Sequence, residues 1–324
     1  MAAERGIRVG VDLGGTKIQT LALDAAGAIV GRDRRPSPAA DGPQAVLAAV
    51  ADGVRGALLD AGAGERDLRA IGLGAPGQVD AARGVVLHAT NLIGWEQPVD
   101  VGTPLREALG APVVLANDVQ ACVTGEHRLG AGRDAASMLG VFCGTGVGGG
   151  LVLDGRLWTG MGAAGEIGHT VVRRGGARCG CGRRGCLEAY AGRRMLEERA
   201  RRWHGRGRRT RLVAIMERKG RASMTSSVWA SAVAEGDPVA VELIDRATLA
   251  LGTAVASACN LVDVERVVIG GGLGSRLGEP FVAAIRAAAE SQALRPGIGE
   301  RIVVSTLGDD AGGVGAALLA GDPG

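Results

Sequence analysis

Two stretches of this chain repeat one pattern, GVDLGGTKIQTLALD at residues 10–24 and GVFCGTGVGGGLVLD at residues 140–154. Each reads as a strand, a glycine turn, a second strand and an Asp-containing turn. A hairpin that opens each half predicts a duplicated two-domain α/β architecture with a central cleft, where small ligands usually bind. Chance similarity in a chain with 56 glycines is the alternative. At a constant offset the coincident positions are Gly10/Gly140, Val11/Val141, Gly14/Gly144, Leu21/Leu151, Leu23/Leu153 and Asp24/Asp154.

Strand and helix patterns alternate around the first copy. They predict a small α/β domain over residues 1–118, completed by a C-terminal helix at about 311–324, and a large α/β domain over 119–310. The strands expected in the small domain are Ile7–Val11, Ile18–Leu23, Ala28–Gly31, Ala70–Leu73 and Val113–Ala116, and its helices are Pro43–Leu59 and Pro104–Leu109.

The composition narrows the class of protein. The 324 residues are 46% apolar, enough for two cores. Two Phe, one Tyr and a net charge of +3 do not suit a nucleic-acid-coating protein, so no nucleic-acid partner is expected. The N-terminus lacks an apolar signal core, and no apolar run is long enough to span a membrane. Cys122, Cys143 and Cys259 lie singly in apolar runs, as reduced thiols do, so we expect a soluble, cytoplasmic protein.

The segment GEIGHTVVRRGGARCGCGRRGCLE, residues 165–188, carries a metal-ligand pattern. Its spacing is H-x9-C-x-C-x4-C, and three cysteines with one histidine make a closed, structural zinc site. The alternatives are a disulfide or three unrelated buried thiols. Glu166 and Glu188 lie at the edges of the segment, where a bound metal would fix them for a ligand. The expected zinc ligands are His169, Cys179, Cys181 and Cys186.

Three glycine clusters, at residues 12–17, 144–150 and 270–274, follow expected strands and suit a nucleotide. None is a Walker A loop, because the required spacing is absent. Backbone N–H groups of such turns can face one anion, Lys17 would add positive charge, and Asp12 would hold Mg²⁺ through water. At the end of a strand, the third cluster would admit a base or ribose. The nucleotide-contacting candidates are Asp12, Gly14, Gly15, Thr16, Lys17, Gly144, Thr145, Gly146, Gly148, Gly271, Gly272 and Leu273.

Together these motifs resemble the ROK family of repressors, open reading frames and sugar kinases, over essentially the whole chain. The resemblance rests on Asp12–Lys17, Ala116–Asp118, Gly144–Gly150, the Cys/His segment and Gly270–Gly274. It implies an actin/hexokinase-like (ribonuclease H-like) duplicated fold. The first phosphate turn begins at residue 12, which leaves no room for the family repressors' helix-turn-helix domain and favours the kinase branch. VGVDLGGTKI and ATNLIGW are most similar to ATP-dependent glucokinases.

The resemblance also implies roles for individual residues. Asp118 matches the family's catalytic base for the sugar hydroxyl that attacks the γ-phosphate of ATP, with Mg²⁺ as the working metal. The alternative for Asn117 and Asp118 is a strand-end turn or a helix cap. Glu166 and His169 would share a face of a helical turn, and His169 would serve both zinc and sugar. The sugar-contacting candidates are Gly77, Thr90, Asn91, Asn117, Asp118, Glu166, His169 and Glu188.

Two features leave alternatives open. The basic segment at residues 193–211 suits either an acidic or nucleic-acid partner or a solvated helix in which Glu197 and Glu198 pair with arginines, and Trp203 is a candidate dimer anchor. The function is either glucose 6-phosphorylation, with N-acetylmannosamine, mannose, fructose or allose as other substrates, or non-catalytic sugar sensing. The resemblance alone suggests a homodimer or homotetramer with sugar and nucleotide as ligands.

Overall fold

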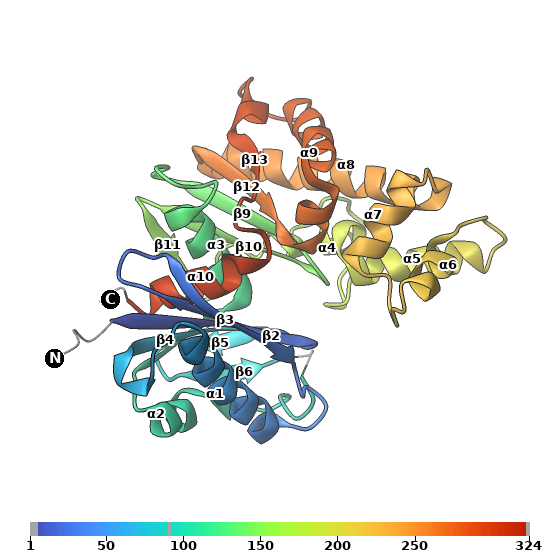
Figure 1. Ribbon diagram of the computed structural model, residues 1–324. Coiled ribbons are helices and arrows are strands. Elements are labelled where there is room, and N and C mark those ends of the chain that lie inside the picture. The colour runs from blue at the N-terminus through green and yellow to red at the C-terminus, as the bar shows by residue number, and fades with distance from the viewer. Residues whose placement is uncertain (1–5, 90–91, 322–324) are drawn as a thin grey trace. The chain divides into compact units, whose positions relative to one another are not determined.

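The computed structural model describes residues 6–89 and 92–321 (Figure 1). The chain forms two compact units: unit 1 contains Met1–Gly130 and Asp309–Gly324, and unit 2 contains Ala131–Gly308. Thr90 and Asn91, two of the predicted sugar contacts, lie outside the described residues.

Unit 1 is built on a five-stranded sheet of order β3-β2-β1-β4-β8. The first three strands form an antiparallel meander, and β4 and β8 run parallel to β1. The strands are β1 (Ile7–Leu13), β2 (Lys17–Leu23), β3 (Ile29–Pro36), β4 (Leu68–Ala75) and β8 (Val113–Asn117). The other elements are α1 (Pro43–Asp60), η1 (Glu65–Asp67), a small sheet of β5 (Gln78–Asp80), β6 (Val85–His88) and β7 (Val99–Asp100), α2 (Gly102–Leu109), α3 (Asp118–Leu129) and α10 (Ala311–Leu319).

Unit 2 repeats this topology. Its sheet order is β11-β10-β9-β12-β13, with an antiparallel meander followed by two strands parallel to β9. The strands are β9 (Met138–Cys143), β10 (Val147–Leu153), β11 (Arg156–Trp158), β12 (Arg266–Gly270) and β13 (Ile302–Val304). The other elements are η2 (Ile167–His169), α4 (Glu188–Ala191), α5 (Arg193–His204), α6 (Leu212–Arg218), α7 (Ser226–Ala234), α8 (Pro238–Val262), α9 (Gly271–Glu290), η3 (Ile298–Arg301) and, leading back to unit 1, η4 (Gly308–Asp310).

The two hairpins correspond less simply than the sequence alignment suggests. The first pairs Leu13 with Ile18, whereas the second pairs Cys143 with Val147, so the second turn is one residue shorter. The equivalent of Leu21, which pairs with Gly10, is therefore Gly150 and not Leu151. The predicted matches Leu21/Leu151, Leu23/Leu153 and Asp24/Asp154 are therefore wrong by one residue. Such a one-residue slip moves every side chain of a strand to the other face.

Helix α10 packs against the sheet of unit 1, although it comes from the far end of the chain (Figure 1). A Cβ atom at Gly10 would lie 1.8 Å from the carbonyl oxygen of Gly313, and one at Gly72 would lie 1.8 Å from that of Ala316. On the other side of α10, a Cβ at Gly315 would lie 1.7 Å from the carbonyl oxygen of Ala121 in α3. Glycine is required here because the backbones touch. This packing keeps α3, which lies beyond the predicted boundary at residue 118, in unit 1.

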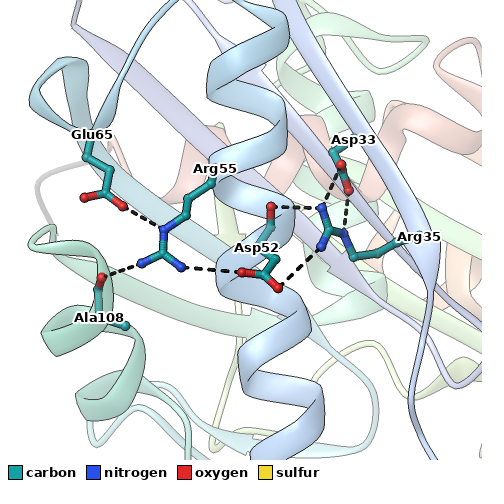
Figure 2. A network of polar contacts seen from close by, with 6 residues as sticks. All are labelled: Asp33, Arg35, Asp52, Arg55, Glu65 and Ala108. Atoms are coloured by element: carbon teal, nitrogen blue, oxygen red, sulfur yellow. Dashed lines mark hydrogen bonds and ion pairs between the residues drawn. The ribbon is translucent and has the colours of Figure 1, made fainter.

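A polar network joins α1 to its neighbours in unit 1 (Figure 2). Arg35 of β3 pairs with Asp33 of the same strand at 2.8 Å and donates to the carbonyl of Asp52 in α1 (2.9 Å). Arg55 of α1 pairs with Glu65 at 2.8 Å. Arg55 also donates to the carbonyl of Ala108 at the end of α2 (3.0 Å). The Arg55–Glu65 pair is about half exposed, and exposed ion pairs each contribute about 1 kcal/mol or less. This pair therefore orients α1 more than it stabilises the fold.

The core of unit 2 surrounds α8. Its first turn is capped by the buried Asp237, whose carboxylate accepts hydrogen bonds from the N–H groups of Val239 (3.1 Å) and Ala240 (2.8 Å). The helix ends at Asp263 in the left-handed conformation (φ 51°). Among the helices that the structure describes, none is both long and apolar enough to cross a membrane.

Candidate functional site

The side chains of His169, Cys179, Cys181 and Cys186 converge in unit 2, with one possible ligand atom of each within 4.8 Å of the others. The sulfurs of Cys181 and Cys186 lie 3.7 Å apart, and the Cys179 sulfur lies 4.0 Å from Nδ1 of His169. Zinc–sulfur bonds of about 2.3 Å in a tetrahedron place two sulfurs about 3.8 Å apart. A disulfide would need about 2.05 Å, and all six cysteines are free. The four residues therefore fit zinc.

Glycine turns bring these ligands together. The N–H of Gly182 donates to the carbonyl of Cys179 (3.1 Å), and the N–H of Gly185 donates to that of Ala177 (2.7 Å). Both glycines have positive φ, 87° and 86°, a conformation that glycine adopts at little cost. The predicted helical turn before the cysteines is a 3-10 turn, η2, in which the His169 N–H donates to the Glu166 carbonyl (3.0 Å).

The three thiols differ in the direction of their pKa shifts. Burial raises the pKa of Cys179 to about 12 and, in the same direction, that of Cys186. At Cys181 the effect of burial is outweighed by hydrogen bonds from Arg183, which lower the pKa of that thiol to about 6. Because a metal binds the thiolate form of cysteine, Cys179 and Cys186, whose pKa values are raised, would release protons as a metal binds.

The carboxylate of Glu188, the first residue of α4, joins this cluster to the second glycine turn. Its Oε1 lies 3.7 Å from the Cys179 sulfur, and its Oε2 accepts a hydrogen bond from the N–H of Val147 (3.2 Å). A Cβ atom at Gly146 would lie 2.2 Å from Oε2. The turn therefore needs glycine at this position so that the carboxylate can approach. Glu166, the other predicted carboxylate, is exposed beside η2.

The second and third glycine clusters meet at one edge of the unit 2 sheet. Strands β9 and β12 are parallel neighbours, with Gly270 opposite Phe142. The second turn closes through the N–H of Gly144 and the carbonyl of Gly146 (2.9 Å). At the third, Gly271 has φ 76°, and a Cβ there would lie 2.6 Å from the Cys143 nitrogen. Leu273 is fully buried, so its side chain packs in the core.

The first glycine turn is in unit 1 and carries charged groups. The N–H of Gly14 donates to the carbonyl of Lys17 (2.9 Å), and Thr16 is exposed at the tip. Burial raises the pKa of Asp12; the charge of Lys17 opposes this shift and that of Asp309 adds to it. A carboxyl whose ionisation is disfavoured by burial and by a second acid is suited to a cation.

Asn117 and Asp118 lie where β8 passes into α3. The side-chain oxygen of Asn117 caps the helix by accepting from the N–H groups of Val119 (2.9 Å) and Gln120 (3.3 Å), so the helix-cap alternative holds for Asn117. Its amide nitrogen donates to the carbonyl of Gly77 (3.0 Å), which links two predicted sugar contacts. Because β1, β4 and β8 are parallel, Asp12 and Asp118 lie at the same sheet edge. Burial, and then the negative charges of Asp12 and Asp118, raise the pKa of Cys122.

The basic segment is largely engaged within unit 2. Arg201 pairs with Glu197 at 2.6 Å, and the Trp203 ring contacts the guanidinium groups of Arg208 (4.3 Å) and Arg246 (5.0 Å). Arg193 donates to the hydroxyl of Thr145 (3.1 Å), a contact that the sequence does not predict because Arg193 opens this basic run. The only sequence signal was its place directly after Gly192, close behind Glu188.

Two α/β units that each open with a glycine-turn hairpin and repeat one strand order define the actin/hexokinase-like fold. The family model described as ROK family matches residues 8–322, and the chain belongs to this family.

Relatives cover nearly the whole chain. A glucokinase of Halalkalibacterium halodurans is 37% identical over 96% of this chain and 94% of its own length. An N-acetylmannosamine kinase of Citrobacter koseri is 32% identical over 96% of this chain and 97% of its own. The crystal structure of a ROK family glucokinase from Streptomyces griseus, in complex with glucose and AMPPNP, superposes with a TM-score of 0.81 at 32% identity, covering 97% and 99% of the two chains.

Proposed function

We propose that this protein is an ATP-dependent hexose kinase that converts glucose to glucose 6-phosphate. The observation that carries the proposal is the carboxylate of Glu188, which lies against both the Cys/His cluster and the second glycine turn. In the proposed enzyme this carboxylate would connect a sugar site beside the Cys/His cluster to a phosphate site at the second glycine turn. The near full-length similarity to a glucokinase supports the same activity.

In the proposed reaction Asp118 is the general base. The 6-hydroxyl oxygen of glucose forms a bond to the γ-phosphorus as the bond from that phosphorus to ADP breaks, and the hydroxyl proton passes to Asp118. Phosphoryl transfer depends mainly on positioning and charge stabilisation, so Asp118 chiefly orients the hydroxyl. Its place at the first turn of α3 keeps the carboxylate on a rigid element.

Sugar hydroxyls are assigned to the polar groups that the sequence predicted. Asn117 keeps one amide N–H for a hydroxyl after its bond to Gly77. Nδ1 of His169 faces Cys179, which leaves Nε2 for the sugar when Nδ1 binds the metal. Zinc bound by the four ligands would hold η2 and Glu188 at fixed positions. Glu166, Gly77, Thr90 and Asn91 complete the proposed set.

The nucleotide is assigned to the three glycine clusters. Because the N–H groups of Gly14 and Gly144 close the two turns, the backbone N–H groups of residues 15–16 and 145–146 suit phosphate oxygens. The edge at Gly271 and Gly272 suits the adenosine. Magnesium ion would arrive with ATP and would neutralise phosphate charge, and Asp12 would hold it through water. A homodimer or homotetramer belongs to the same proposal and can be measured by light scattering.

A kinase for N-acetylmannosamine is the second candidate, because a kinase of that name is 32% identical to this chain. One assay separates the candidates: ADP release from MgATP with glucose, N-acetylmannosamine, mannose, fructose, allose and N-acetylglucosamine. We expect the highest kcat/KM with glucose. Preference for another hexose would change only the substrate, whereas no ADP release by folded, zinc-loaded protein would favour a sugar sensor.

A further inference from the structure

The guanidinium group of Arg193 lies at the second glycine turn without an acidic partner. Arg193 is the first residue of α5, and its Nη2 donates to the hydroxyl of Thr145 (3.1 Å) while its Nη1 donates to that of Ser226 (3.1 Å). Its backbone N–H donates to the carbonyl of Gly144 (3.1 Å), which fixes the start of the helix against the turn. Within residues 6–89 and 92–321, no carboxylate forms an ion pair with this group.

The environment is unfavourable for a lone cation. Arg193 is half-buried, and desolvation lowers its pKa, an effect that the charge of Glu197 only opposes. The carboxylate of Glu197 is itself bound to Arg201 (2.6 Å) and to the N–H of Met224 (2.8 Å). Two neutral hydroxyls do not compensate a positive charge that has lost part of its water. An anion at this position would compensate the charge.

The same guanidinium lies beside the third glycine cluster. A Cβ atom at Gly272 would lie 2.7 Å from the Ser226 hydroxyl and 3.9 Å from Nη1 of Arg193. The group is therefore close to both turns of unit 2 that present backbone toward the proposed nucleotide. A guanidinium carries five N–H donors in one plane, so two bonds to hydroxyls leave others for phosphate oxygens.

We propose that Arg193 binds the diphosphate of the nucleotide, together with the hydroxyl of Thr145 and the N–H groups of the second turn. This inference rests on the proposed function. The ligand class is a nucleoside diphosphate or triphosphate. Adenosine alone lacks the anion that the site would compensate.

Calorimetric titration of MgADP and of adenosine tests the proposal. For Arg193→Gln we expect ADP affinity to fall about 10- to 100-fold, the range for a lost charge-assisted hydrogen bond, with adenosine affinity changed by less than about twofold. Arg202→Gln removes the same charge from an exposed position of α5 and should leave both affinities within about twofold. Thermal unfolding and zinc content of each variant report on folding.

A second variant tests whether ADP binding depends on the charge of Arg193 or on its hydrogen bond to Ser226. Ser226→Ala removes one anchor of the guanidinium but keeps its charge, and we expect ADP affinity to change by less than about threefold. Three results would overturn this inference but not the proposed function. They are a loss of ADP affinity in Ser226→Ala as large as that in Arg193→Gln, an equal loss of adenosine and ADP affinity in Arg193→Gln, and unchanged ADP affinity in Arg193→Gln. Failure of the unaltered protein to bind MgADP would overturn the proposed function and this inference with it.

Discussion

The two hairpins share a topology but are supported in different ways. The first, β1–β2, rests on backbone contact: Gly10 meets the carbonyl of Gly313 in α10. Side chains of unit 1 form a chain of hydrogen bonds beside its turn: Lys17 donates to Gln19 (3.2 Å), and Gln19 donates to Asp310 (2.8 Å). The second hairpin, β9–β10, is shorter by one residue and is held by side chains that follow it in unit 2, those of Glu188 and Arg193.

This difference separates what the duplication supplies from what each unit adds. The repeated sheet order supplies a strand, a glycine turn and a returning strand in both units. In unit 1 the added elements are α3 and α10, which bring Asp118 and close packing. In unit 2 the additions are the Cys/His loop and α5. Changes at Asp118 should therefore affect the chemical step, changes at the contact with α10 should affect stability, and changes at the Cys/His loop or at the start of α5 should affect ligand binding.

The largest expected effect is at Asp118. Asp118→Asn should lower kcat with glucose by about 10²- to 10⁴-fold, because the base is lost while the side-chain shape is kept. Glucose affinity, measured by fluorescence or calorimetry, should change little. Asp245→Asn, an exposed change on α8, is the matched control. A kcat within about threefold of the unaltered protein would remove Asp118 as the base.

The next effect is expected at the metal cluster of unit 2. Cys181→Ser should lower zinc affinity and raise the KM for glucose together, each by about tenfold or more, since Glu188 and His169 lose their fixed positions. Zinc content by mass spectrometry and KM measure the two effects. Cys259→Ser, a buried thiol of the same unit outside the cluster, is the control. Zinc loss without a change in KM would break the link between metal and sugar.

Two glycine substitutions compare the hairpins directly. Gly10→Ala pushes a methyl group into the backbone of α10, so the free energy of unfolding should fall by about 1–3 kcal/mol or more. Gly146→Ala meets the movable carboxylate of Glu188, so it should cost less stability and should instead weaken glucose binding. Urea unfolding compares both with Gly64→Ala, where a Cβ meets nothing within 4 Å. A larger loss at Gly146 than at Gly10 would reverse the comparison.

The smallest effect is expected in the exposed network of α1 (Figure 2). Arg55→Gln should cost less than about 1 kcal/mol of unfolding free energy, because Arg55 and Glu65 are about half exposed. Kinase activity should not change. A loss of several kcal/mol in urea unfolding would show that the network stabilises unit 1.

Several features of the fold were predictable because apolar strands and glycine turns alternate clearly. β4 was expected at Ala70–Leu73 and extends over Leu68–Ala75. The sequence predicts β3 at Ala28–Gly31, but the strand spans Ile29–Pro36 and includes the four charged residues RDRR. It is an edge strand with largely exposed side chains, so hydrophobicity does not mark its end. The shortened second turn was hidden because a run of glycines aligns equally well in two registers.

The candidate site was predictable where spacing alone carries the chemistry. The four metal-ligand candidates meet because H-x9-C-x-C-x4-C contains its own turns. The contact of Glu188 with Val147 and that of Arg193 with Thr145 join segments about 40 residues or more apart, and no local pattern encodes such contacts. The boundary of unit 1 at Gly130 likewise depends on α3 packing against α10 from the other end of the chain.

The most direct test is to incubate the zinc-loaded protein with MgATP and glucose and to follow the products by phosphorus NMR. We expect glucose 6-phosphate and ADP in equal amounts, and almost no product with Asp118→Asn under the same conditions. Undiminished product formation by Asp118→Asn, or none by the unaltered protein with any hexose, would contradict this expectation.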